Sequence, residues 1–270
     1  MGNRESGAGN RGRGSVDLYE VLGLLAAATA AGWVDAVVGG GGVLLIPVLL
    51  LAFPTYSPAV ALGTNKIAAV MGTATAAYMY QRRTKLDRKV LLPAAGLAVP
   101  FGALGALSAS SVPTSYFRPV IMGLLISVAL FVAFRPSFGV QQRDVVVTPR
   151  RRTAAILIAG VGIGFYDGVF GPGVGTFLII SFTTLLATQF LESAAMAKVI
   201  NASSNLGALA VFAWQGNVLW ALGLGMAVGN IAGAMIGSRT AMKRGSGFVR
   251  IVLVLVVTAM VAKMAFDQFA

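Results

Sequence analysis

Two glycine-rich interruptions within apolar runs constrain the fold of this chain more than any other feature. The first lies in Gly32–Gly42, where Asp35 precedes four consecutive glycines. The second lies in Gly164–Gly173, where Asp167 stands four residues before Gly171. Glycine costs about 1 kcal/mol per residue relative to alanine in a helix, so each cluster predicts that an apolar helix ends there.

A constant shift of 132 residues relates the two interruptions. Asp35 and Asp167 differ by 167 − 35 = 132, and Lys66 and Lys198 differ by 198 − 66 = 132. Without a gap, the same shift also superposes Gly32 on Gly164, Gly39 on Gly171, Gly41 on Gly173, Gly105 on Gly237 and Arg118 on Arg250. We interpret this agreement as an internal duplication, with two repeats built around the two interruptions.

Composition assigns the chain to the integral membrane proteins. Of its 270 residues, 57% are hydrophobic and 11% are charged, and the mean hydropathy is +0.81. Soluble domains carry about twice that share of charged residues, whereas a membrane-spanning helix needs about 20 apolar residues. We therefore expect an all-α integral membrane fold of two repeats, each with about five helical segments, and broken or re-entrant helices at the glycine clusters.

The absence of cysteine and histidine excludes several kinds of chemistry. The chain can form no disulfide, Cys/His zinc site, His-ligated haem or Ser-His-Asp hydrolase site. We expect no cofactor, no metal and no enzymatic activity, because no nucleophile with a base is visible. The net charge of +12 comes from basic residues in short loops, which the positive-inside effect explains better than nucleic-acid binding does.

Four regions follow from the alternation of charged and apolar segments. They are a polar tail at 1–17, a first membrane repeat at 18–134, a cytoplasmic basic linker at 135–152 and a second membrane repeat at 153–270. The expected spans are Leu18–Val38, Ala59–Gln81, Val90–Leu107, Tyr116–Phe134, Thr153–Phe170, Ser193–Trp214, Leu219–Ser238 and Phe248–Phe269, with shorter arms at Val43–Phe53 and Val174–Leu191. The first run follows a basic tail, but we expect it to be retained because it carries the first interruption.

Loop charges favour opposite insertion of the two repeats. The loop Arg82–Lys89 holds five basic residues and its repeat equivalent holds none, while the loop Arg239–Arg250 holds four and its equivalent holds one. Such an exchange is what inverted repeats produce. The arginines of the N-terminal tail favour the alternative, a parallel arrangement.

Two lysines within helices mark the candidate binding site. A charge at the bilayer centre costs at least a few kcal/mol, so such residues are usually functional or paired; for Lys66 and Lys198, snorkelling to the interface is the alternative. Lys198, Asn201 and Asn205 share one helix face by their spacing, and Lys66 shares one with Thr73. A polar stripe on each of two equivalent helices predicts a shared internal site.

The glycine clusters offer backbone donors to the same site. Consecutive glycines expose N–H groups, and a helix that begins after the break points its positive end at the gap. Close helix packing is the alternative role of these glycines. For Asp35 and Asp167 we favour a structural role, pairing with the lysines or holding the loop amides, over the alternative that one of them carries a coupling proton.

Together these residues resemble the TauE/SafE sulfite exporter family of membrane transporters, also called the toluene sulfonate uptake permease family. The matching elements are Gly32-Trp33-Val34-Asp35 through Gly39-Gly40-Gly41-Gly42, Pro47, Gly63-Thr64-Asn65-Lys66, the second break with Asp167, and Ala197-Lys198-Val199-Ile200-Asn201, and the likeness covers nearly all of residues 18–269. Gly171-Pro172-Gly173 departs from the plainer glycine pattern of the first half. The resemblance implies a multi-pass transporter of the cell (inner, cytoplasmic) membrane for sulfur-containing anions such as sulfite, sulfonates or sulfoacetate-like compounds.

The functional hypothesis is a secondary transporter that exports a small anion by alternating access, with proton coupling left open. The residues expected to bind the anion are Lys66 and Lys198 by charge, Thr64, Asn65, Asn201 and Asn205 by hydrogen bonds, and the backbone of Gly40, Gly41, Gly42 and Gly173–Gly175. A passive anion channel and a non-transporting membrane scaffold or assembly factor are the alternatives. The expected partners are the small anion and the lipid bilayer, without nucleic acid; a homodimer is left open.

Overall fold

The fold is helical throughout the residues that the computed structural model describes, namely 18–53, 55–109 and 146–269, and these ranges contain no strand. In chain order the elements are α1 (Leu18–Val38), α2 (Gly41–Ala52), α3 (Pro58–Gln81), α4 (Arg88–Ala109), α6 (Pro149–Leu157), the π-helical η1 (Ile158–Ile163), α7 (Gly164–Val169), α8 (Val174–Leu185), α9 (Phe190–Trp214) and α10 (Trp220–Phe269). The all-α prediction is confirmed. The expected tail at 1–17, the span Tyr116–Phe134 and the linker residues 135–145 lie outside the described residues.

Four helical stretches within the described ranges are long and apolar enough to cross a membrane. They are Val21–Val38, Arg88–Ala109, Pro149–Val169 and Trp220–Gly245. α3 and α9 have 24 and 25 residues, so they reach about 36 Å at 1.5 Å per residue, but they carry more polar side chains. Each contains an unbroken run of buried residues, 61–68 in α3 and 193–198 in α9, because neighbouring helices cover every face there.

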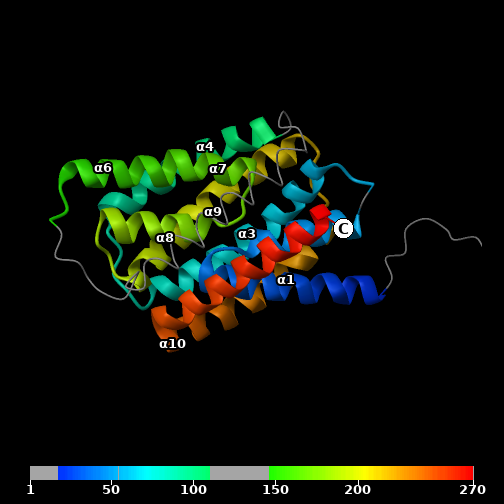
Figure 1. The fold of residues 1–270 in the computed structure, drawn as a ribbon. Coiled ribbons are helices and arrows are strands. Elements are labelled where there is room, and N and C mark those ends of the chain that lie inside the picture. The colour runs from blue at the N-terminus through cyan, green and yellow to red at the C-terminus, as the bar shows by residue number, and fades with distance from the viewer. Residues whose placement is uncertain (1–17, 54, 110–145, 270) are drawn as a thin grey trace, which may run out of the picture.

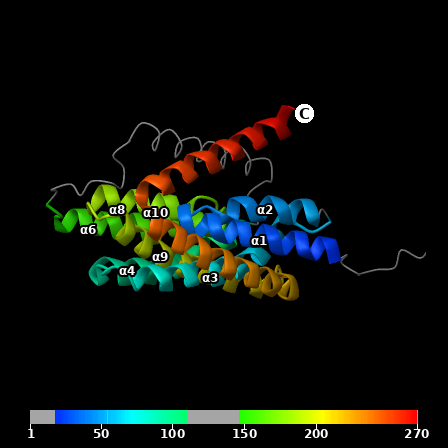
Figure 2. The ribbon, with the colours of Figure 1, turned by 90° about the horizontal axis from the view of Figure 1, so that it is seen from below.

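Each glycine cluster turns the chain back on itself. Gly39, with φ of +83°, follows the last residue of α1, and Gly171 and Gly173, with φ of +90° and +80°, follow α7. These are left-handed backbone conformations that glycine adopts without strain. Figures 1 and 2 show α2 lying beside α1, and α8 beside the α6–α7 helix, so the predicted breaks are confirmed and both shorter arms are re-entrant.

The two hairpins enter from opposite ends of the molecule and touch at their tips (Figure 1). The amide of Gly175 donates a hydrogen bond of 3.1 Å to the carbonyl of Gly39, and the hydroxyl of Thr176 donates one of 2.5 Å to the carbonyl of Val38. A Cβ added to Gly39 would lie 2.4 Å from the Cα of Gly175. Backbone therefore meets backbone at the centre, where no larger residue fits.

α3 and α9, the two helices that the predicted duplication relates, run in opposite directions (Figure 1). Gly63, near the start of α3, lies against Phe212 and Asn217 at the end of α9 and just beyond it. Opposite insertion of the two repeats requires that α3 and α9 be antiparallel. The duplication itself and the membrane side of each loop stay predictions.

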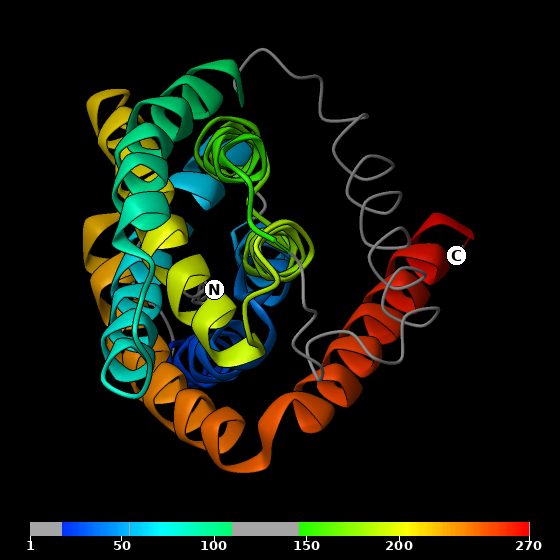
Figure 3. The same cartoon turned by 90° about the vertical axis from the view of Figure 1, so that its left-hand side faces the viewer.

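The C-terminal helix differs from the sequence expectation. The predicted loop at Arg239–Arg250 is wrong, because α10 remains helical through Arg244 and its geometry breaks only at Gly245, with φ of +73°. Arginine and lysine are good helix formers, so their charge does not end a helix. Beyond Gly245 the chain turns away from the bundle, as Figures 2 and 3 show.

Candidate functional site

Two ion pairs, one buried and one partly buried, cross between the halves of the molecule. The ammonium of Lys66 on α3 lies 2.9 Å from Oδ1 of Asp167 on α7. The ammonium of Lys198 on α9 lies 3.0 Å from Oδ2 of Asp35 on α1. Each half thus contributes a lysine to one pair and an aspartate to the other.

Both lysines also hold the ends of the broken helices. Lys66 donates a hydrogen bond of 2.6 Å to the main-chain carbonyl of Asp167, and Lys198 donates one to the main-chain carbonyl of Asp35. Carbonyls in the last turn of a helix carry partial negative charge, which a cation stabilises; that of Asp35 also accepts a hydrogen bond of 2.8 Å from the amide of Gly39. The ammonium groups therefore fix the two helix ends that face the glycine clusters.

The remaining partners of the carboxylates come from nearby polar groups. Oδ2 of Asp167 accepts a hydrogen bond of 2.5 Å from the hydroxyl of Ser204. Oδ2 of Asp35 accepts one of 3.2 Å from the hydroxyl of Thr73, while its Oδ1 accepts only a long bond of 3.4 Å from the amide of Gly41. The interpretation of both aspartates as lysine partners agrees with this geometry, and Asp35 also meets a loop amide.

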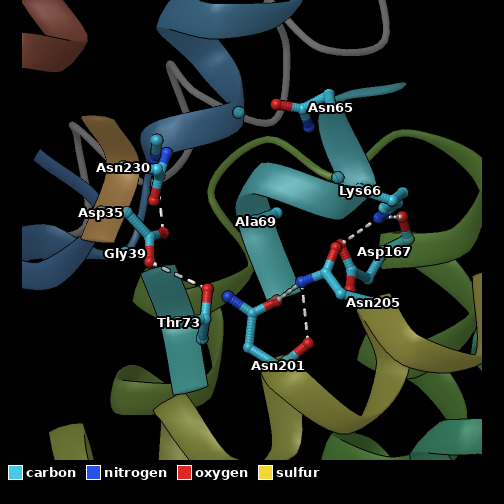
Figure 4. Close-up of a pocket in the computed structure, with 13 residues that line it drawn as sticks. Asp35, Gly39, Asn65, Lys66, Ala69, Thr73, Asp167, Asn201, Asn205 and Asn230 are labelled. Atoms are coloured by element: carbon cyan, nitrogen blue, oxygen red, sulfur yellow. Dashed lines mark hydrogen bonds and ion pairs between the residues drawn. The ribbon is translucent and has the colours of Figure 1, made fainter. Parts of the chain in front are cut away.

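A small cavity lies between the two pairs and beside the hairpin tips (Figure 4). Its lining comprises Asp35, Gly39, Gly41, Gly42, Asn65, Lys66, Ala69, Thr73, Asp167, Gly171, Asn201, Asn205 and Asn230. The volume open to the centre of a water molecule is about 20 Å³, which is room for one water-sized group. In this conformation the cavity is too small for a polyatomic anion of several heavy atoms.

Two of the asparagines that line the cavity have unused hydrogen-bonding groups. The side chains of Asn65 and Asn230 are each 4% exposed, and neither amide forms a hydrogen bond to another described residue. Asn205 is different, because its Nδ2 donates to both the carbonyl and Oδ1 of Asn201. Because neither amide is closed off from the cavity that it lines, Asn65 and Asn230 are placed to bind a group that enters it.

The structure brings most of the predicted site residues together. Of those residues, the cavity is lined by Lys66, Asn65, Asn201, Asn205, Gly41, Gly42 and both aspartates. Four others lie outside the lining. Thr64 accepts a hydrogen bond from the amide of Leu219, and Lys198 is paired with Asp35 without lining the cavity itself. Gly40 and Gly173 are the N-cap residues of α2 and α8. Neither lysine faces open solvent, since both are 2% exposed or less.

Sequence reasoning missed Asn230 and Ser204. Neither has a polar counterpart in the other half, because the residues at the matched positions are Ala98 (230 − 132 = 98) and Gly72 (204 − 132 = 72). A search for polar residues present in both repeats therefore passes over them. Ser204 also lies three residues from Asn201, so the polar stripe on α9 was the signal that could have found it.

The arrangement is suited to binding a polar ligand. The charges of two lysines and two aspartates cancel, and the remaining cavity groups are amides, one hydroxyl and the backbone N–H groups at the start of α2. Broken helices that meet around a buried polar site are common in secondary transporters. Fold and site thus define a multi-pass helical membrane protein of the transporter class.

Comparison with known proteins supports this class and narrows it. The sequence pattern of the family described as "Sulfite exporter TauE/SafE" matches residues 24–264, so the chain belongs to the TauE/SafE family of membrane transporters. The "Probable membrane transporter protein ORF9" of Sinorhizobium sp is 38% identical over 244 residues, which cover 90% of this chain and 92% of that protein. The resemblance inferred from the glycine clusters and lysines is confirmed.

Two further relatives carry similar names. The "Probable membrane transporter protein YfcA" of Escherichia coli (strain K12) is 37% identical over 249 residues, covering 89% of this chain and 88% of that protein. A "Probable membrane transporter protein" of Haemophilus influenzae is 33% identical over 256 residues, covering 94% and 96%. No solved structure gives a significant match.

Proposed function

We propose that this protein is a secondary transporter that moves a small sulfur-containing anion, such as sulfite or a sulfonate, out of the cell across the inner membrane by alternating access. The observation that carries the proposal is the cavity at the meeting point of the two re-entrant hairpins, lined by the unpartnered amides of Asn65 and Asn230. The family to which the chain belongs supports an anion of this class, since its description names a sulfite exporter.

Neutral donors, assisted by a helix end, account for anion binding in this proposal. Both ammonium groups are paired with carboxylates, so the lysines do not present an unpaired charge to the cavity. The amide N–H groups of Asn65, Asn201 and Asn230 surround the space, and α2 begins beside it with Gly41 and Gly42. A helix N-terminus and side-chain amides together bind oxyanions without a formal positive charge.

Access to the site requires movement of the hairpins. The cavity admits about one water molecule in the observed conformation, so a sulfonate enters only if the contact between Gly39 and Gly175 separates or a hairpin shifts relative to α3 and α9. Such rocking of one half against the other around a fixed site is how inverted-repeat transporters alternate access. The direct partners in this proposal are the anion and the lipid bilayer.

Flux measurements in proteoliposomes test the proposal. Purified protein should exchange labelled sulfite or a small sulfonate and show counterflow, which a passive channel does not. Replacing Asn65 or Asn230 by alanine should raise the half-saturating concentration about tenfold, because one hydrogen bond of ~1–2 kcal/mol is lost. Asn217→Ala is the matched control, since Asn217 bonds Gln215 outside the cavity and its loss should leave flux unchanged.

Three results would contradict the proposal. Flux without counterflow would identify a channel. The absence of flux for every sulfur-containing anion, in protein that remains folded and monodisperse, would favour a scaffold or assembly factor. Normal half-saturation in both the Asn65→Ala and the Asn230→Ala variants would show that the cavity is not the binding site.

A further inference from the structure

The two carboxylates beside the cavity differ in a way that assigns them different roles. We propose that Asp35, and not Asp167, takes up one proton when the site binds one monovalent anion, so that anion and proton occupy and leave the site together. This inference rests on the proposed function, because it concerns the same cavity. It adds which group binds the proton, how many protons accompany each anion, and that transport then moves no net charge.

Charge balance at the site supplies the first step. Lys66, Lys198, Asp35 and Asp167 sum to zero, and all four are buried or nearly so. Adding an anion to this set leaves a net negative charge away from water, which is strongly unfavourable in a low-dielectric surrounding. A proton that arrives with the anion restores neutrality, so binding of the anion favours binding of the proton and the reverse.

Hydrogen bonding decides which carboxylate receives the proton. Asp167 is 2% exposed, and each of its oxygens has a short partner: Lys66 at 2.9 Å and Ser204 at 2.5 Å. Asp35 is 14% exposed, and its Oδ1 has only the 3.4 Å contact with the amide of Gly41. A proton from water therefore reaches Oδ1 of Asp35 without breaking a short bond, whereas Asp167 has no free oxygen.

Protonation of Asp35 leaves the helix end intact. Lys198 also binds the main-chain carbonyl of Asp35, so its ammonium stays in place when the carboxylate becomes neutral. The positive charge of Lys198 is then unbalanced, and the anion in the adjacent cavity supplies the compensating charge. Asn230 lies beside Asp35 (Figure 4), where its carbonyl oxygen can accept a hydrogen bond from the new carboxyl O–H.

The ionisable groups that face Asp35 come from three helices. They are Lys198 on α9, Lys66 and Tyr80 on α3, and Asp167 on α7. α2 and α8 contain no ionisable side chain, and the described α10 residue at the cavity is the uncharged Asn230. The ion pair with Lys198 balances the charge of Asp35 when no anion is present, so binding of the two ligands is coupled.

The test measures binding of methanesulfonate, which stays a monoanion over the range used, to the full-length protein by thermal shift and isothermal titration. Linkage of one proton to one anion makes the affinity for methanesulfonate rise as pH falls, by at most about tenfold per pH unit. Asp35→Asn mimics the protonated side chain, so its affinity should be independent of pH. The double variant Lys66→Met/Asp167→Leu removes one charge of each sign and retains the pair of Lys198 and Asp35, so it should keep the pH dependence of the wild type.

Flux in liposomes gives a second readout that needs no variant. Transport of one monoanion with one proton moves no net charge, so the methanesulfonate flux of the wild-type protein should not change when a potassium–valinomycin gradient imposes a membrane potential. Affinity that does not vary with pH, a pH dependence that persists in Asp35→Asn, or a flux driven by the potential would each overturn the inference. Those results still include binding or flux, whereas failure of the proposed function would show neither at any pH.

Discussion

The two lysine–aspartate pairs occupy matched positions in the two halves, yet they differ in their contact with the cavity. The pair of Lys66 and Asp167 is closed, since both side chains are 2% exposed. In the pair of Lys198 and Asp35, the lysine is 1% exposed but the aspartate is 14% exposed. The pair of Lys66 and Asp167 is therefore fully enclosed, whereas Asp35 in the other pair retains a carboxylate oxygen that is accessible from the cavity.

One residue difference explains much of this contrast. Ser204 saturates Asp167 with its hydroxyl, whereas the matched position holds Gly72, which has no side chain to offer Asp35. The space beside Gly72 is used by Asn230 instead, because a Cβ on this glycine would lie 1.7 Å from Oδ1 of Asn230. The two halves thus carry one closed and one open lysine–aspartate pair.

Breaking the closed pair should have the largest effect. Lys66→Met leaves the carboxylate of Asp167 buried without a cation, and losing one partner of a buried pair costs about 3–5 kcal/mol of unfolding free energy. SDS titration in mixed micelles measures this loss. The double variant Lys66→Met/Asp167→Leu should recover most of it, because no unpaired charge remains; a double variant as unstable as the single one would show that the pair is not the source.

The same change in the open pair should cost less. Lys198→Met leaves Asp35 partly hydrated and still bonded to Thr73 and Gly41, so we expect a loss of about 2 kcal/mol, below the range for fully buried pairs. The SDS titration used for Lys66→Met gives the comparison directly. Equal losses for the two lysine variants would remove the distinction between closed and open pairs.

Hydroxyl partners of the carboxylates offer a finer comparison. Ser204→Ala removes the 2.5 Å bond to Asp167 and should cost about 1.5–3 kcal/mol, as for hydrogen bonds to charged groups. Thr73→Val removes the 3.2 Å bond to Asp35 and should cost about 0.5–1 kcal/mol, because the bond is longer and less buried. Thermal unfolding followed by tryptophan fluorescence should rank the two in this order, and the reverse order would contradict the assignment.

An effect as small as that of Thr73→Val concerns a bond that only one half contains. The hydroxyl of Tyr80 donates to the carbonyl of Ala36 at 2.9 Å, near the end of α1, and the matched position, 80 + 132 = 212, is Phe212. Tyr80→Phe should therefore cost about 1 kcal/mol and make the first half resemble the second. Thermal unfolding measures the loss, with Tyr78→Phe at an exposed position of α3 as the control.

The sequence was informative where structure depends on local properties. Glycine clusters disfavour helix through their own backbone, so both breaks could be placed, and lysines within apolar runs are usually buried with partners, with snorkelling as the alternative. It could not tell which aspartate each lysine would meet, because the crossing of the pairs depends on how α3 and α9 pack. Asn230 could not be predicted for a similar reason, because only tertiary packing places this single asparagine beside the other site residues.

The contact of Gly39 with Gly175 limits the rate of transport that we expect. Where the barrier consists of backbone alone, no side chain can swing aside to open it, and whole half-helices must separate instead. Collective motions of this kind take microseconds to milliseconds. Turnover should accordingly be that of a carrier, at most about a thousand ions per second for millisecond steps, and single-channel currents should be absent from planar bilayers that contain the protein.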